Sequence, residues 1–235
     1  MIKSICLKEV KSYFKKPTAL IFIGIFFMSA AFRFVESLVM GSTDIQALFS
    51  QYAGYIWVLL PILSVSLIPD EISAGTDRLL FTSPGSCFEI VFGKFLASLI
   101  VFTVGLISTI LFTLVFIIHA KPGFMLVLNT YFALFMYGSA ILAIGLFFGS
   151  ALKNTVAGLA ASFGLIIFMN QITVLKMITE FPQWLGKIVD FLSINDKYNA
   201  FFGTLVSPEA FVYFFSLTVI FLLLSALTVR KRSSN

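Results

Sequence analysis

Six long stretches of this chain carry almost no charge, and they restrict its fold more than any other feature. Each has close to the ~20 apolar residues that a helix needs to cross the hydrocarbon of a membrane. Strand barrels also span membranes, but their strands alternate polar and apolar residues, and the run from Leu99 to Ile118 does not alternate. The sequence therefore predicts an all-α integral membrane protein, a single transmembrane domain over residues 1–235. Its six spans are expected at Pro17–Val39, Ile45–Pro69, Phe95–Ile118, Pro122–Leu152, Asn154–Leu175 and Ala210–Val229.

The composition excludes a soluble domain of the same length. Of the 235 residues, 59% are hydrophobic and 11% are charged, whereas about a quarter of an ordinary globular domain is charged. The first span contains Arg33, which we expect to extend its side chain toward the membrane surface. Two cysteines, Cys6 and Cys87, are too few for a disulfide framework.

The basic residues predict the orientation of the chain. Lysine and arginine gather on the cytoplasmic side of membrane proteins, and most of them here flank the spans on the side of both termini. These residues are Lys3, Lys8, Lys11, Lys15, Lys16, Arg78, Lys94, Lys153, Arg230, Lys231 and Arg232. We therefore expect a multi-pass protein of the cell membrane with both termini and both thiols in the cytoplasm. The net charge of +5 is then explained by the basic residues that orient the protein in the membrane, and no nucleic-acid partner is expected.

Two segments outside the spans have patterns of their own. Met1–Lys16 places apolar residues on one broad face and lysines opposite, with Glu9 at the edge. This predicts an interfacial helix on lipid headgroups, although a plain basic flank is the alternative. The outer segment at 176–209 has two apolar stripes, one around Trp184 and one around Tyr198, each too short to cross a membrane. We expect this segment to lie in, or dip into, the outer membrane interface.

The largest cytoplasmic segment, Asp70–Lys94, is organised as more than a linker. Ser86 followed by Glu89 has the spacing of a capping box, which predicts a helix start there. A short helical stretch, Thr76–Phe81, lies between Gly75 and a turn. Such a stretch can transmit a movement of a soluble partner to the membrane helices. The alternative is that the segment is an ordinary solvated hairpin without this role.

The sequence contains no pattern that indicates an enzyme. The single histidine, His119, has no cysteine or histidine partner nearby, and Gly93-Lys94 lacks the upstream glycine of a phosphate-binding loop. We therefore expect no catalytic residue, metal or cofactor. Asn170 and Gln171 are large polar residues within the fifth predicted span; they line a substrate path or, more commonly, pack helices. Pairs of small residues four apart indicate close helix contacts, within the bundle or between copies: Gly145 with Gly149, and Ala160 with Gly164.

Across most of its length the chain resembles the permease subunit of type-2 ABC exporters, in particular the gliding-motility-associated (GldF-like) branch. The similarity begins at Lys15-Lys16-Pro17 and continues to the last span. It is strongest over Asp70–Leu96. The matching residues there are Glu71, Gly75-Thr76, Leu79-Leu80, Thr82-Ser83-Pro84, Glu89-Ile90-Val91 and Gly93-Lys94-Phe95-Leu96.

The resemblance implies a subunit that moves a substrate across the membrane with ATP hydrolysed by a partner. The implied partners are an ABC ATPase, a second permease protomer (a homodimer or a paralogue) and an accessory subunit with a large extracytoplasmic domain. The residues implied to form a coupling helix and its flanks are Glu71, Gly75, Thr76, Leu79, Leu80, Ser83, Pro84, Glu89 and Lys94. Two alternatives remain: the same motion acts on an extracytoplasmic partner without transport, or the chain is a stand-alone channel or scaffold.

Overall fold

The computed structural model describes residues 2–42, 44–70, 86–152, 154–178, 183–202 and 207–233. Over these residues the chain is helical between its turns, without strands. Six helical segments are long and apolar enough to cross a membrane, which confirms the predicted all-α membrane fold. The helices are α1 (Ile2–Lys15), α2 (Thr18–Val39), α3 (Ile45–Val65), α6 (Cys87–Ser108), α7 (Ile110–Ala120), α8 (Phe124–Ala151), α9 (Thr155–Ile178), α10 (Gln183–Leu192), α11 (Ile194–Asn199) and α12 (Pro208–Ser233).

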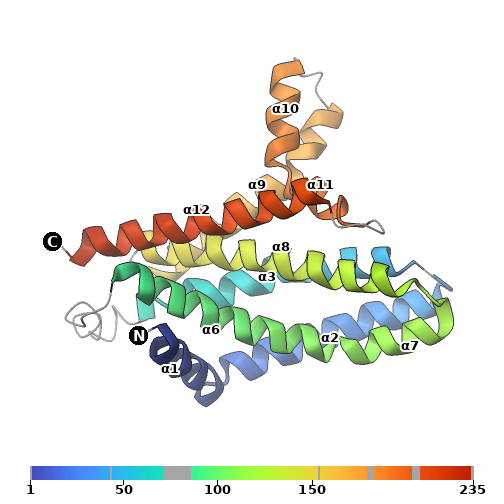
Figure 1. Ribbon diagram of the computed structural model, residues 1–235, viewed down its shortest axis with the longest axis horizontal. Coiled ribbons are helices and arrows are strands. Elements are labelled where there is room, and N and C mark those ends of the chain that lie inside the picture. Colours follow the sequence, from blue (N-terminus) through green and yellow to red (C-terminus); the bar gives the residue numbers. More distant parts are fainter. Residues whose placement is uncertain are drawn as a thin grey trace.

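The spanning helices form an elongated bundle in which α8 is central (Figure 1). This helix packs most extensively against α3 and α12, and also against α9 and α6. Both chain ends lie at one end of the bundle, together with the end of α3 and the start of α6 (Figure 1). The turns between α2 and α3 and between α7 and α8 lie at the opposite end. Six spans therefore return the chain to the side on which it began.

Glycines on α8 let its backbone approach α3 closely. A Cβ added to Gly149 would overlap the carbonyl oxygen of Val65, and one added to Gly145 would overlap the hydroxyl of Ser64. Gly164 on α9 differs, because a Cβ there would meet nothing within 4 Å. The first predicted small-residue pair thus packs within the bundle, whereas Gly164 faces outward.

Helix α6 begins with the predicted capping box. The backbone N–H of Glu89 donates to the Ser86 hydroxyl at 3.3 Å, and the N–H of Ser86 donates to the Glu89 carboxylate at 3.1 Å. Together these bonds satisfy two amides that a helix start leaves without intrahelical partners. The cap places the start of α6 at Cys87, about two turns before the predicted third span.

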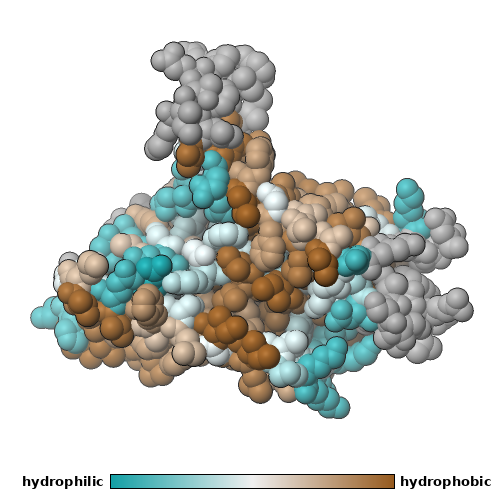
Figure 2. All heavy atoms as spheres, turned by 180° about the vertical axis from the view of Figure 1, so that it is seen from behind, coloured by the Kyte–Doolittle hydropathy of each residue, from teal (hydrophilic) through white to brown (hydrophobic). Residues whose placement is uncertain are grey.

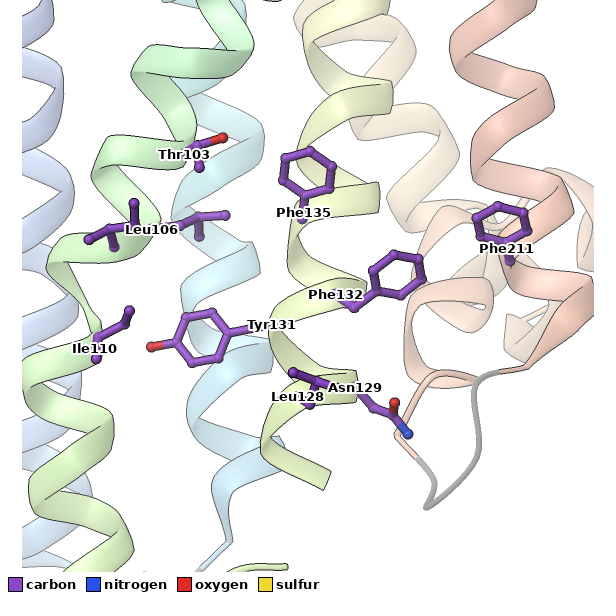
Figure 3. A pocket seen from close by; sticks show the side chains of 10 residues that line it. Thr103, Leu106, Ile110, Leu128, Asn129, Tyr131, Phe132, Phe135 and Phe211 are labelled. Atoms are coloured by element: carbon purple, nitrogen blue, oxygen red, sulfur yellow. The ribbon is translucent and has the colours of Figure 1, made fainter. Parts of the chain in front are cut away.

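A bend at Thr109 separates α6 from α7. Its backbone N–H donates to the carbonyl of Leu106 at 3.1 Å, and its hydroxyl donates to the same carbonyl at 2.7 Å. Beside this bend an apolar groove opens between α6 and α7 on one side and α12 on the other, over α8 (Figure 3).

The outer segment divides into two parts with different environments. Helix α10 points away from the long axis of the bundle (Figure 1), which is the direction expected for a helix parallel to a membrane surface. By contrast, Tyr198 of α11 is only 1% exposed, and its hydroxyl donates to the carbonyl of Phe49 at 3.1 Å. Tyr198 therefore faces the protein interior, where a tyrosine is accommodated because its hydroxyl finds a partner. The depth of this segment at the outer membrane interface stays a prediction.

Arg33 of the first span has partners within the protein, and the expected extension of its side chain toward the membrane surface stays a prediction. Its Nε donates to the hydroxyl of Tyr55 on α3 at 2.8 Å, and its Nη1 donates to Glu36 one turn further along α2 at 2.6 Å. The guanidinium also lies 5.5 Å from the centre of the Tyr55 ring. Arg33 is therefore held by protein partners, and only about a third of its side chain is exposed.

The molecular surface agrees with a membrane protein. Figure 2 shows the side opposite the view of Figure 1, where hydrophobic atoms dominate the middle and hydrophilic atoms gather toward the ends. Exposed leucine, isoleucine and phenylalanine side chains are frequent on α7 and α12. Their exposure is explained if lipid tails cover them.

The contact between α8 and α3 generates a first prediction. Gly149→Ala should destabilise the protein by about 1–3 kcal/mol, the usual cost of overpacking, because the backbone of α3 must move. Gly24→Ala is the matched control, since a Cβ at Gly24 meets nothing within 4 Å. Thermal unfolding in detergent measures both changes, and equal midpoints for the two variants would contradict the packing described here.

Candidate functional site

Most of the predicted coupling residues lie outside the described residues. These are Glu71, Gly75, Thr76, Leu79, Leu80, Ser83 and Pro84. The structure does describe the two flanks of this segment, which end at Asp70 and begin again at Ser86. Of the predicted residues it describes Glu89, in the capping box of α6, and Lys94, about one turn further along the same helix.

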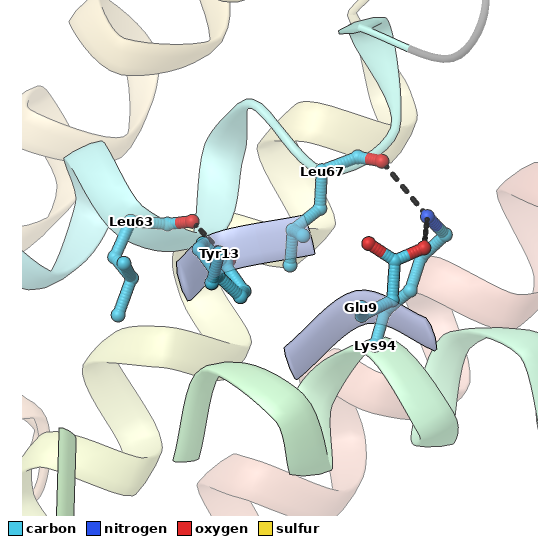
Figure 4. Close-up of polar contacts among 5 residues, drawn as sticks. All are labelled: Glu9, Tyr13, Leu63, Leu67 and Lys94. Atoms are coloured by element: carbon cyan, nitrogen blue, oxygen red, sulfur yellow. Dashed lines mark hydrogen bonds and ion pairs between the residues drawn. The ribbon is translucent and has the colours of Figure 1, made fainter. Parts of the chain in front are cut away.

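Lys94 connects three elements at the end of the bundle that holds the termini (Figure 4). Its Nζ donates to Glu9 Oε1 of α1 at 3.0 Å and to the carbonyl oxygen of Leu67 at 2.9 Å. Leu67 belongs to the turn that follows α3. We call Glu9, Lys94 and the Leu67 carbonyl the Lys94 junction. It ties together the two flanks of the segment at 71–85 and the N-terminal helix.

Burial gives the Lys94 junction its importance. The Lys94 side chain is 1% exposed and that of Glu9 is 10% exposed. A buried ammonium is costly unless an opposite charge and further acceptors replace its water. The Glu9 carboxylate and the Leu67 carbonyl are two such groups. Lys94 is one of the basic residues that predict the orientation of the chain, and in the structure it is also an internal contact.

Helix α1 docks on the bundle through one face. Cys6, Glu9 and Tyr13 are its buried residues, and the Tyr13 hydroxyl donates to the carbonyl of Leu63 at 2.7 Å. Ile5 packs so closely on Gly93 of α6 that a Cβ there would lie 2.9 Å from it. The lysines of α1 are exposed on its other faces. Contact of those lysines with lipid headgroups stays a prediction.

Two groups on α1 have altered acidities. Burial raises the pKa of the Tyr13 hydroxyl well above its usual value, and the nearby carboxylates of Glu9 and Asp70 raise this pKa further. Burial likewise raises the pKa of the Cys6 thiol. Both groups are therefore neutral near pH 7, and Tyr13 keeps the proton that it donates to Leu63.

Glu9 was the sequence signal for this junction. It is the single carboxylate of an otherwise basic helix, and a carboxylate that the fold buries needs a partner of opposite charge. Lys94 supplies that charge from 85 positions away in the sequence, so spacing alone did not identify the pair.

Asn170 and Gln171 have different environments on α9. Asn170 is half-buried; its carbonyl oxygen accepts from the Tyr137 hydroxyl at 3.4 Å and its amide donates to Ile166 at 2.9 Å. Gln171 is exposed on the surface of the bundle. Asn170 thus contributes to packing between α8 and α9, and Gln171 is the one of the two that faces outward.

Comparison with known proteins identifies one family. The sequence model of a family described as ABC-2 family transporter protein matches residues 4–233, which is nearly the whole chain. No curated protein matches the chain.

The Lys94 junction generates a second prediction. Lys94→Met should leave the Glu9 carboxylate buried without its ammonium and destabilise the docking of α1 by about 3–5 kcal/mol. In a Cys87→Ser background, Cys6 then reports this change, because undocking exposes its buried thiol. Alkylation of Cys6 should become at least about tenfold faster, which needs only ~1.4 kcal/mol.

Two further variants test the pairing itself. Lys11→Met removes an exposed lysine of α1 and should leave the rate of Cys6 alkylation unchanged. Combining Glu9→Gln with Lys94→Met removes both charges and should recover much of the loss. An alkylation rate that does not respond to Lys94→Met would show that the ion pair does not hold α1.

Proposed function

The chain belongs to the ABC-2 family of transporter membrane proteins, and on that basis we propose that it is the permease of an ATP-driven exporter. In this proposal a partner ATPase binds at the segment at 71–85 and drives the bundle between two states that expose a substrate to opposite sides. The same segment lies in the cytoplasm of the cell, together with both termini. One observation carries the proposal: the Lys94 junction joins both flanks of that segment to each other and to α1.

The junction supports coupling for a mechanical reason. Force applied to a segment between two helices is transmitted to the bundle only if its flanks resist moving independently. The bonds from Lys94 to Leu67 and Glu9 link the end of α3, the start of α6 and α1. We infer that these three elements move as one body when the ATPase closes on ATP, a shift between two packed states.

The resemblance to type-2 exporters assigns roles within the segment itself. Gly75 and Thr76 shape the start of the coupling helix, Leu79 and Leu80 pack into the ATPase or the bundle, and Ser83-Pro84 end the helix. In the same way Glu71 opens the segment, while Glu89 and Lys94 set the return into the membrane. The capping bonds of Glu89 and the burial of Lys94 are consistent with that last role.

We propose that two copies, or this chain and a paralogue, assemble through the surface formed by α3 and α9. A Cβ added to Gly54 of α3 or to Gly164 of α9 would meet nothing within 4 Å. Each of the two helices also has an exposed amide, Gln51 on α3 and Gln171 on α9. Small residues permit close helix contact in lipid, where polar side chains gain by meeting a partner. An accessory extracytoplasmic subunit and a role in gliding motility remain predictions from the resemblance alone.

The coupling segment generates the third prediction. Isolated in mild detergent from its own cells, the native chain should carry ATPase activity with it. Leu79→Asp together with Leu80→Asp should abolish that activity by charging an apolar contact, with membrane insertion unchanged. The matched control is Leu79→Met with Leu80→Met, which keeps the apolar character. If no ATPase accompanies the native chain under several mild conditions, the stand-alone channel or scaffold is favoured instead.

The exposed amide on α9 generates the fourth prediction. If the substrate path runs along the α3 and α9 surface, Gln171→Leu should lower the coupled ATPase activity while the unfolding midpoint stays the same. Asn170→Leu should instead lower the stability by roughly 1 kcal/mol, since it removes an interhelical hydrogen bond. Val174→Leu, also exposed on α9, is the control. Native activity with both amides replaced by leucine would remove these residues from the path.

A further inference from the structure

The apolar groove over α8 has no role in the proposed function. Its volume is about 680 Å³, within the range of sites that hold small molecules. Leu106 and Ile110 form one wall, Phe211 of α12 forms the other, and Phe132 and Phe135 lie along the floor (Figure 3). We refer to this feature as the α8 groove.

Hydroxyl groups at the groove are engaged within the protein. The Tyr131 hydroxyl is bonded to the hydroxyls of Thr109 and Thr113 at 3.1 and 2.8 Å. The Thr103 hydroxyl donates to the carbonyl of Leu99 at 2.7 Å. What remains for a ligand is almost entirely hydrocarbon and aromatic surface. A polar or ionic ligand would lose its hydration here without replacement.

The position of the groove within the spans indicates what fills it. Its rim residues Ile107 and Leu128 are 57% and 53% exposed, so the groove opens onto the face that lipid tails cover. Between Leu128 and Phe135 the helix rises ~10 Å, which is less than half of a hydrocarbon core of ~30 Å. The groove therefore lies within one leaflet, on the side of the turn between α7 and α8.

We propose that the α8 groove binds an acyl chain of a phospholipid from that leaflet. An apolar channel that opens sideways into hydrocarbon is complementary to a single unbranched chain, which gains dispersion contacts on the aromatic floor. Asn129 lies at the end of the groove nearest this turn (Figure 3). Two exposed residues lie beside this turn, His119 in the last turn of α7 and Lys121 in the connection to α8, at the level where a phosphate headgroup would sit.

The Thr109 bend explains why the groove exists. Its side chain and N–H both bond back to Leu106, and Tyr131 of α8 reaches across to the hydroxyls of Thr109 and Thr113. These contacts fix α7 to α8 on one side, while α12 meets α8 on the other. A lipid chain in the groove would complete the packing between α6 and α12 in this half of the bundle.

The test reconstitutes the full chain without any ATPase in palmitoyl-oleoyl phosphatidylcholine vesicles, then extracts it in mild detergent. Native mass spectrometry then counts the phospholipids that each chain retains. The native chain should keep one phosphatidylcholine. Combining Ile110→Trp with Leu128→Trp should fill the groove and lower this occupancy at least about tenfold, a loss of ~1.4 kcal/mol or more. Leu227→Trp, on an exposed face of α12 away from the groove, should retain it.

A second measurement on the native chain covers the case in which the filled variant does not fold. Phosphatidylcholine with a diazirine on its acyl chain should label Phe132 and Phe135, whereas a headgroup diazirine should label the turn between α7 and α8. No retained lipid on the native chain, equal loss from the Leu227→Trp control, or no acyl labelling of the floor would each overturn the proposal. The proposal would also be overturned if the lipid were lost when ATP is added in the presence of the ATPase, because a lipid released in this way would be a transported substrate and not a bound component of the bundle.

Discussion

The buried ammonium of Lys94 is the constraint on which the described end of the bundle depends. Near the start of a membrane-spanning helix, a charge without solvent must be neutralised by a carboxylate and satisfied by further acceptors. Glu9 supplies the carboxylate, so α1 must lie against α6; Leu67 supplies a carbonyl, so the turn after α3 must lie there as well. A single side chain thus contacts all three elements, and the bond from Tyr13 to Leu63 and the packing of Ile5 on Gly93 support the same arrangement.

The remainder of the bundle is held by contacts that suit a lipid environment. Helices gain little from hydrophobic burial where the surroundings are equally apolar, so close packing and interhelical hydrogen bonds become more important. Gly145 and Gly149 provide the close packing of α8 on α3. Tyrosine hydroxyls provide bonds between elements: Tyr13 to Leu63, Tyr198 to Phe49 and Tyr137 to Asn170. A centre packed in this way suits the force transmission that we propose.

The two sides of the molecule differ in the residues that they expose. On the side of α3 and α9, small residues and exposed amides favour contact with another polypeptide or an aqueous path. On the side of α6, α7 and α12, apolar side chains and the α8 groove favour contact with lipid. The ends also differ, since Lys94 lies near the start of α6 and the groove is lined by residues near the start of α8, from Leu128 to Phe135. These two helix starts lie at opposite ends of the bundle (Figure 1). The proposed sites for the ATPase, the second protomer and the lipid therefore lie on separate surfaces.

Local signals in the sequence determined the class of fold and several of its boundaries. Six apolar runs require six spans because a helix must satisfy its backbone within lipid, and the capping box at Ser86 and Glu89 acts within four residues. Features that depend on residues far apart in the chain were decided only by the tertiary structure. These are the partner of Lys94, the burial of Tyr198, the bond from Arg33 to Tyr55 and the outward face of Gln171. The physical reason is the distance along the sequence over which each interaction acts. Span length and helix caps depend on neighbouring residues, whereas a buried charge or hydroxyl is satisfied by whichever element the fold brings beside it.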